Sequence, residues 1–150
     1  FSLSRQFQNV EKQINQSFNA KKHTFRGLHM QQPPFSEGKI VRCIAGSVQD
    51  VVLDLRKDSE TFLQTQDFLL SATKHECLYI PKGLAHGFLT LEDASALSYF
   101  HDTNYEPGSE FCVRYNDPLI QLKLKENIEH ISQKDTEYAL LPTDFKGFEL

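Results

Sequence analysis

The chain has 150 residues, and its 16 Lys and Arg against 20 Asp and Glu give a net charge of −4 at neutral pH. This mildly acidic balance is not typical of proteins that bind nucleic acids or anionic membranes. No apolar run approaches the length of a bilayer-spanning helix, so we expect a soluble protein without a membrane partner. With 39% hydrophobic residues the sequence is too apolar for a disordered chain, and it predicts one folded domain over residues 1–150.

The first predicted elements are a short helix and a pair of strands. A polar stretch from Arg5 to Asn15 favours one short helix. Two apolar runs, Lys39–Ile44 and Val48–Leu55, then flank the turn at Ala45–Ser47, and this pattern predicts a β-hairpin.

Five more strand-like runs follow, separated by turn signals rich in Pro, Gly and Asn. They cover Glu76–Ile80, Leu84–Leu91, Ala94–Phe100, Phe111–Tyr115 and Leu119–Leu124. The last stretch, Asn127–Leu150, is polar and then aromatic, and we expect it to lie across the surface. Many short strands without a long helical period are typical of an all-β sandwich or barrel.

Three cysteines, Cys43, Cys77 and Cys112, are widely spaced and each is flanked by apolar residues. They are odd in number and include no CxxC pair, so we expect three reduced, buried thiols in a cytoplasmic protein. The chain opens at Phe1 rather than Met, and we expect its natural start to be missing.

Two histidines lie in apolar, strand-like stretches beside a glycine: His29 in Arg26–His29 and His86 in Leu84–Leu89. A single histidine in such a stretch is more often a structural residue than a catalyst. Two of them together favour a polar cavity inside a barrel.

A metal site is an alternative use for these imidazoles, because small β-barrels often carry one. Zinc and iron sites need three or four His, Cys or carboxylate ligands, often as a close pair on one strand. The sequence has no H-x-H pair, so we expect no metal. The remaining histidines lie in polar stretches that we expect to be exposed: His23, His75, His101 and His130.

Three more residues are candidates for an acid–base site beside the two histidines. Lys39 follows His29 after a short excursion through Gln31–Pro34, which suits a return to the same barrel mouth. Tyr99 lies near the end of an apolar run, where a phenol can give or take a proton. Asp135, in the C-terminal segment, can fix the tautomer of a histidine base. Each also has a structural interpretation, as a solvated strand edge, a core aromatic residue and a surface charge.

At these positions the sequence resembles the dTDP-4-dehydrorhamnose 3,5-epimerase family, a branch of the cupin-like barrels. The matching stretches stand in the family's order from about Gln16 to Asp135. They include Arg26–Gln31, Lys39–Cys43, Asp50–Arg56, Leu78–Gly83, Ala85–Phe88, Tyr105–Pro107, Asn116–Pro118 and Ile131–Asp135. Each stretch is weak as a motif, but together they are very specific.

The resemblance implies a cupin-like jelly-roll barrel with short peripheral helices, usually a homodimer, that works without a metal or organic cofactor. The implied substrate is a nucleotide-linked 4-keto-6-deoxyhexose. The implied reaction removes the protons on C3 and C5 and returns them from the opposite face.

The family's pattern also implies a role for each candidate residue. His29 is the base and Asp135 its orienting partner, while Tyr99 returns the proton. Lys39 stabilises the enolate oxygen at C4. The implied substrate contacts are Arg26, Lys39, His86, Tyr105, Glu110 and Lys134.

One stretch departs from the family, and it affects substrate binding. We interpret Phe1–Phe7 as the remnant of a D-x-R-G-x-F stretch. A C3-only epimerase acting on another nucleotide-linked ketohexose is an alternative that the sequence does not separate. A non-catalytic sugar-binding barrel is another, although we would expect it to have lost His29, Lys39 or Tyr99.

Overall fold

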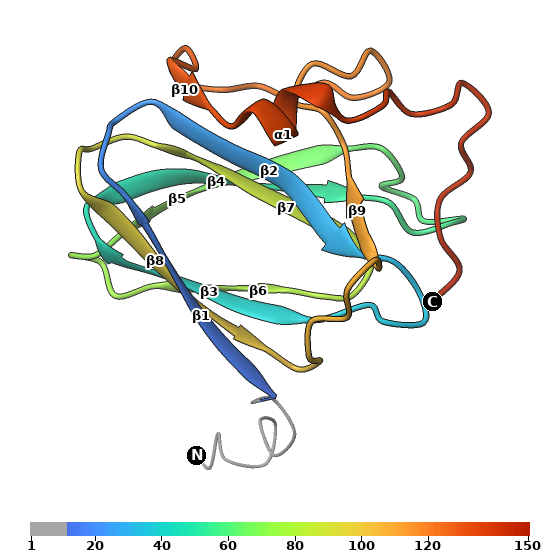
Figure 1. Ribbon diagram of the computed structural model, residues 1–150, viewed down its shortest axis with the longest axis horizontal. Helices are drawn as coiled ribbons and strands as arrows, with labels where there is room; N and C mark the ends of the chain where they lie inside the picture. The colour runs from blue at the N-terminus through green and yellow to red at the C-terminus, as the bar shows by residue number, and fades with distance from the viewer. Residues whose placement is uncertain (1–11) are drawn as a thin grey trace.

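Two β-sheets face each other in the computed structural model, which describes residues 12–150 (Figure 1). The strands are, in chain order, β1 (Gln13–Asn19), β2 (Thr24–Gln31), β3 (Lys39–Ala45), β4 (Ser47–Asp54), β5 (Thr65–Ser71), β6 (Cys77–Ile80), β7 (Leu84–Thr90), β8 (Ser95–His101), β9 (Glu110–Cys112) and β10 (His130–Ile131). A five-residue helix, α1 (Gln133–Glu137), follows β10. The prediction of an all-β fold with short peripheral helical structure is confirmed.

The chain passes repeatedly from one sheet to the other. The smaller sheet has the strand order β1-β8-β3-β6, and the larger has the order β10-β2-β7-β4-β5, with β9 also paired to β2. Consecutive strands such as β3 and β4, or β6 and β7, therefore lie in different sheets. This winding leaves a space between the sheets that side chains from both can reach.

Apolar side chains fill two cores, one on each face of the larger sheet. Every residue of β4 is buried, because its side chains alternate between the two cores. Val48 and Val52 pack in the inner core between the sheets. Val51 and Leu53 pack in the outer core, together with partly buried residues of the C-terminal segment such as Phe148. The prediction that this segment crosses the surface is confirmed (Figure 1).

The predicted hairpin of Lys39–Ile44 and Val48–Leu55 is wrong. β3 pairs with β6 and β8, whereas β4 pairs with β5 and β7 in the other sheet. One residue, Gly46, joins the two strands at a φ of 67°. A Cβ there would lie 2.4 Å from Ser95 Oγ, so glycine lets the chain turn the corner between the sheets. Two apolar runs around a glycine do not specify which sheet each run joins.

Three other predicted elements also differ from the structure. Gln13–Asn15 belong to β1 rather than to a helix, and the earlier part of that prediction lies outside the described residues. The run Phe111–Tyr115 forms a strand only as far as Cys112. Leu119–Leu124 is irregular: the Gln121 carbonyl accepts a hydrogen bond from a side-chain hydroxyl, and its apolar residues pack on the outer core.

The three thiols differ in burial. Cys43 is buried as predicted, but Cys112 is half-buried and Cys77, on the edge strand β6, is exposed. Cys77 is preceded by the charged Glu76 and is apolar-flanked only on the side of Leu78, which fits its exposed position. Between residues 12 and 150 no helix has the length and hydropathy needed to cross a membrane.

Candidate active site

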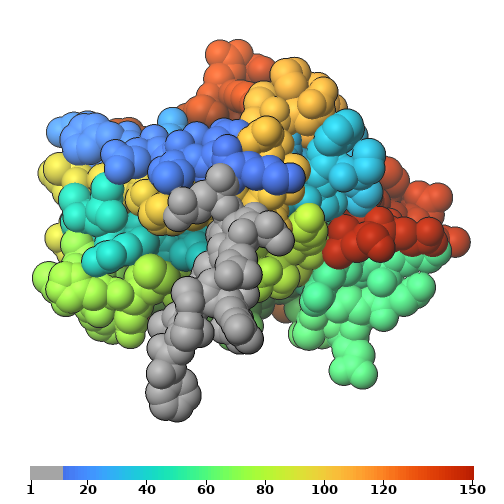
Figure 2. Space-filling model, turned by 90° about the horizontal axis from the view of Figure 1, so that it is seen from below, coloured from blue at the N-terminus to red at the C-terminus, as the bar shows by residue number. Residues whose placement is uncertain are grey.

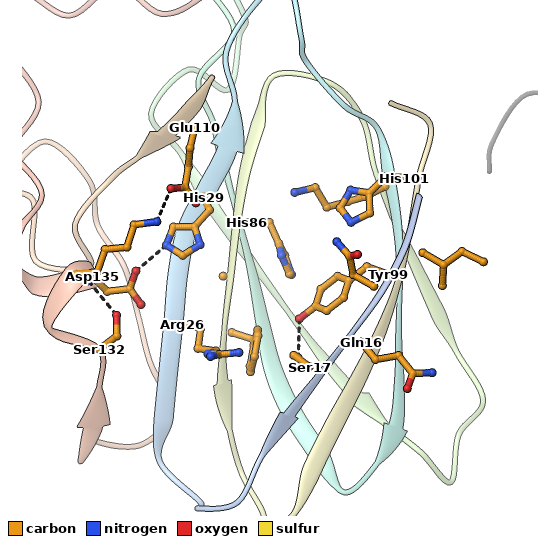
Figure 3. A pocket seen from close by; sticks show the side chains of 16 residues that line it. Gln16, Ser17, Arg26, His29, His86, Tyr99, His101, Glu110, Ser132 and Asp135 are labelled. Atoms are coloured by element: carbon orange, nitrogen blue, oxygen red, sulfur yellow. Dashed lines mark hydrogen bonds and ion pairs between the residues drawn. The ribbon is translucent and has the colours of Figure 1, made fainter. Parts of the chain in front are cut away.

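A cavity of about 820 Å³ lies between the two sheets (Figure 3). The larger sheet contributes Arg26, His29 and His86, and the smaller sheet contributes Lys39 and Tyr99. Glu110 from β9 and Lys134 and Asp135 from α1 also line it. Eight of the nine residues expected from the sequence therefore meet in one cavity, although they come from six different elements.

An irregularity in β2 brings Arg26 and His29 to the same side. Residues three apart on a regular strand face opposite sides of the sheet. The pairing of β2 with β7 shifts by one residue between Arg26, opposite Phe88, and His29, opposite His86. Gly27 lies inside this shift with a φ of 131°, and a Cβ there would lie 2.5 Å from the Cα of Gly87. The two glycines permit the close approach of the strands that carry both histidines.

His29 and Asp135 form a hydrogen-bonded pair at one side of the cavity. His29 Nε2 lies 2.6 Å from Asp135 Oδ1, and the imidazole is 34% exposed whereas the carboxylate is 4% exposed. Burial opposes the charge on Asp135, but the hydrogen bond and charge of His29 together with hydrogen bonds from Ser132 and the Gly27 backbone outweigh it and lower the pKa of that carboxyl. Ser132 caps α1 by accepting a hydrogen bond from the Asp135 N–H, which fixes the backbone beneath the carboxylate.

A second histidine–carboxylate pair is formed by His86, which lines the cavity, and Asp50, which is fully buried behind it. His86 Nε2 is 2.8 Å from Asp50 Oδ2, and the two side chains are 7% and 0% exposed. Asp50 Oδ1 is buried and has no hydrogen-bond partner among the described residues. Because His29 and His86 are direct neighbours across β2 and β7, the two pairs lie side by side in the sheet.

Tyr99 and His101 reach the cavity from β8 on the other side (Figure 3). Their rings stack with centroids 6.2 Å apart, and the Tyr99 hydroxyl lies 3.1 Å from Ser17 Oγ on β1. Burial raises the pKa of Tyr99 well above its usual range, so its phenol is neutral. Burial and the charge of Lys39 lower the pKa of His101.

Lys39 is held by a buried carboxylate. Its Nζ lies 2.9 Å from Glu37 Oε1, and the two side chains are 7% and 6% exposed. The other carboxylate oxygen of Glu37 accepts a hydrogen bond from the Gln31 N–H. A buried ion pair of this kind fixes the position of the ammonium group on the cavity wall.

The remaining expected residues lie at the rim. Lys134 forms an ion pair with Glu110. Arg26 is exposed and forms no ion pair within residues 12–150. Tyr105 does not line the main cavity. It lines an adjoining cavity of about 90 Å³ that shares His29 and Glu110 with the main one.

The prediction that His101 is exposed is wrong, because His101 lines both cavities. His23 is partly exposed, at 18%, and lies 2.7 Å from Glu126. The alternation Tyr99-x-His101 on a strand was the available signal, because the two side chains face the same way. His75 and His130 are exposed as predicted.

Two buried carboxylates, Asp50 and Glu37, were not proposed as site residues. No local pattern pairs Asp50 with His86 or marks Glu37 as the partner of Lys39. Within the described part of the chain, no group of three or more His, Cys, Asp or Glu side chains is arranged to hold a metal ion.

Known proteins are similar to this chain in sequence and fold. A family profile described as dTDP-4-dehydrorhamnose 3,5-epimerase matches residues 2–143. The dTDP-4-dehydrorhamnose 3,5-epimerase of Salmonella typhimurium is 40% identical over 123 residues, which cover 81% of this chain and 67% of that protein. The chain spans 54–67% of the length of the first curated relatives that it matches.

Solved structures show the same similarity. The Bacillus anthracis dTDP-4-dehydrorhamnose 3,5-epimerase with TDP and PPi bound has a TM-score of 0.83 and 38% identity, over 86% of this chain and 74% of that one. The Legionella pneumophila dTDP-6-deoxy-D-glucose-3,5-epimerase in complex with dTDP-4-keto-L-rhamnose has a TM-score of 0.81 and 35% identity, over 93% and 77%. The expected cupin-like jelly-roll architecture is confirmed.

Proposed function

The chain belongs to the dTDP-4-dehydrorhamnose 3,5-epimerase family, and on that basis we propose that it inverts C3 and C5 of dTDP-4-keto-6-deoxyglucose. The C4 ketone acidifies the protons on both neighbouring carbons, so each inversion is proton removal followed by reprotonation from the opposite face. The observation that carries the proposal is a histidine–carboxylate pair on one side of the cavity and a neutral tyrosine on the other.

His29 acts as the base. An imidazole titrates near neutral pH without large tuning, and its partial exposure lets it reach a substrate in the cavity. The bond to Asp135 fixes the tautomer of the ring and stabilises the imidazolium that forms when it accepts a proton.

Tyr99 acts as the acid. Because burial keeps its phenol neutral, the hydroxyl holds a proton to donate. His29 projects from the larger sheet and Tyr99 from the smaller one, so a sugar between them loses a proton on one face and gains one on the other (Figure 3). This arrangement supports inversion rather than simple exchange.

Lys39 stabilises the negative charge that develops on the C4 oxygen. A fixed cation in a low-dielectric cavity is effective because it needs no reorganisation during the reaction. The buried Glu37 holds the ammonium group in place and removes the cost of leaving it unpaired in the absence of substrate. The reaction moves only protons and therefore needs no redox cofactor.

The rim residues bind the nucleotide-sugar. Arg26 has no competing carboxylate in the described chain, and its planar guanidinium suits phosphate oxygens. His86, Glu110 and Lys134 surround the sugar side, and Tyr105 contacts the nucleotide side from the adjoining cavity.

We propose a cytoplasmic homodimer built from one jelly-roll domain per chain. Three free cysteines fit a reducing compartment, and the family resemblance supports the dimer.

The experiment is to incubate the protein with dTDP-4-keto-6-deoxyglucose in deuterated water and follow the sugar by NMR. We expect deuterium at both C3 and C5 together with inverted product. Deuterium at C3 alone would support the C3-only epimerase instead, and no incorporation would support the sugar-binding barrel. Tyr99→Phe should permit exchange while impairing inversion, and normal inversion by that variant would contradict the assignment of Tyr99.

A further inference from the structure

The hydroxyl of Tyr99 forms one hydrogen bond among residues 12–150, and the proposed reaction gives the partner in that hydrogen bond no role. That partner is Ser17 Oγ, at 3.1 Å. Ser17 lies on β1, the edge strand of the smaller sheet, which pairs with β8. β1 runs along the surface of the molecule, and its residues Asn15, Gln16 and Phe18 are exposed (Figure 2). Ser17 and Tyr99 are both half-buried and line the cavity, and Ser17 lies on the strand at the edge of the sheet.

The proposed function requires Tyr99 to be reprotonated after each inversion. Each inversion leaves His29 protonated and Tyr99 as a phenolate. Burial disfavours that phenolate, as the raised pKa of Tyr99 records, and the next inversion requires the phenol. A proton must therefore reach Tyr99 from solvent, while His29 returns its own proton to solvent.

The other groups around Tyr99 are poorly placed for this transfer. His101 stacks on the tyrosine ring at an interplanar angle of 28°, and His86 approaches the ring at 71° with centroids 6.0 Å apart. Neither imidazole forms a hydrogen bond with the hydroxyl. Ser17 does, and a serine hydroxyl can accept one proton while it donates another.

We propose that Ser17 positions the Tyr99 hydroxyl and relays a proton to it from solvent after each inversion. The Ser17 Oγ–H bond breaks as the Tyr99 Oη–H bond forms, and Ser17 Oγ takes a proton from a water molecule at the surface. The hydroxide left behind is neutralised by the proton that His29 releases, so no other reactant is consumed. This inference rests on the proposed function, because only a reacting Tyr99 needs to be reloaded.

The test is the time course of inversion after rapid mixing of enzyme and dTDP-4-keto-6-deoxyglucose. Ser17→Ala starts with a protonated Tyr99, so we expect a fast phase that inverts about one carbon per active site. The steady rate that follows should be at least about tenfold slower than in the parent, because water must now reload the phenolate unaided. Adding imidazole buffer, a small proton donor, should restore the steady rate in proportion to its concentration.

Two further variants complete the test. Ser17→Thr keeps the hydroxyl and should behave like the parent. Ser71→Ala makes the same change at the end of β5, away from the cavity, and should have no effect. A Ser17→Ala enzyme with the parent's steady rate would overturn the relay and leave the proposed function standing. A uniform slowing without a fast phase or buffer rescue would also overturn the relay, and a parent that exchanges neither carbon would overturn both proposals.

Discussion

The two histidine–carboxylate pairs of the cavity use the same chemistry in different surroundings. In both pairs a histidine Nε2 contacts an aspartate oxygen, and the two histidines are neighbours across β2 and β7. The imidazole of His29 is 34% exposed, whereas that of His86 is 7% exposed. The carboxylates also differ in origin, because Asp50 lies on the central strand β4 and Asp135 on the peripheral helix α1.

This contrast separates the pair that performs proton transfer from a pair that is fixed in place. A base must reach its substrate and exchange protons with solvent, and a carboxylate on a peripheral element leaves one side of the ring open. A histidine and a carboxylate on adjacent core strands are both held by packing, so their hydrogen bond has little freedom to change during a reaction. We therefore expect damage to the His29 pair to reduce the rate of proton transfer, and damage to the His86 pair to reduce stability and the substrate binding to which His86 contributes in the proposed function.

The largest effect should follow from removing the exposed imidazole. His29→Ala deletes the only base that we propose, so deuterium incorporation at C3 and C5 should fall by about 10²–10⁴-fold. The melting temperature should also fall, because the substitution leaves the buried Asp135 carboxylate without the imidazole that it contacts. If the His29→Ala enzyme remained active, His86 would be the base, and the less exposed pair would be the one that performs proton transfer.

Asp135→Asn should have the next largest effect on activity. An asparagine has nearly the shape of the aspartate, but it cannot stabilise the imidazolium and can hold the wrong tautomer. We expect the epimerisation rate to fall by about 10²-fold, with a decrease of the unfolding midpoint in urea at pH 7 that is smaller than that of the Asp50 variant. A loss of stability as large as that of the Asp50 variant below would show that exposure does not distinguish the pairs.

The same variant tests the pH dependence of stability. The folded-state pKa of Asp135 lies below its unfolded value, so its contribution is present above the unfolded pKa and is lost as the pH falls through the folded pKa. Urea unfolding measured across the acid range should therefore show a steeper loss of stability for the parent than for Asp135→Asn. If the stability of the two proteins fell equally with decreasing pH, the pKa of Asp135 would not be lowered in the folded state.

Asp50→Asn should act mainly on stability. The substitution places an amide N–H₂ or a neutral oxygen against His86 in a fully buried site, where the Oδ1 position already lacks a partner. Leaving a buried polar group unsatisfied costs about 1–3 kcal/mol, which urea unfolding can measure. The matched comparison is Asp135→Asn, the same chemical change in the more exposed pair.

The sequence indicated both members of the His29 pair but only one member of the His86 pair. His29, His86 and Asp135 were found because each motif lies in a local stretch that resembles the family. Asp50 was inside such a stretch, but its role depends on the alignment of β4 with β7, a contact between residues 36 positions apart. Long-range strand pairing also explains why the hairpin at Gly46 was wrong, since local apolar patterns do not record the sheet that each strand joins.

His101 shows the same limit at the level of one residue. Its neighbours Asp102 and Thr103 are polar, and this suggested a surface loop, yet the last position of β8 still faces the cavity. Strand periodicity would have placed it beside Tyr99 if the end of the strand had been known. All-β architecture, by contrast, follows from many short apolar runs together, so errors in single runs did not change it.

The smallest effect should follow from removing the N-cap of α1, the helix that carries Asp135. Ser132→Ala removes the cap that holds the Asp135 N–H, at a cost of up to about 1 kcal/mol in a helix of only five residues. The carboxylate then samples positions away from His29, and we expect the epimerisation rate to fall a few-fold while the Asp135 amide exchanges faster with solvent. Ser132→Asp, which restores a capping oxygen, should recover both values. If Ser132→Ala left the amide exchange unchanged, the orientation of the reactive pair would depend on the hydrogen bond with His29 itself and not on the helix that carries the carboxylate.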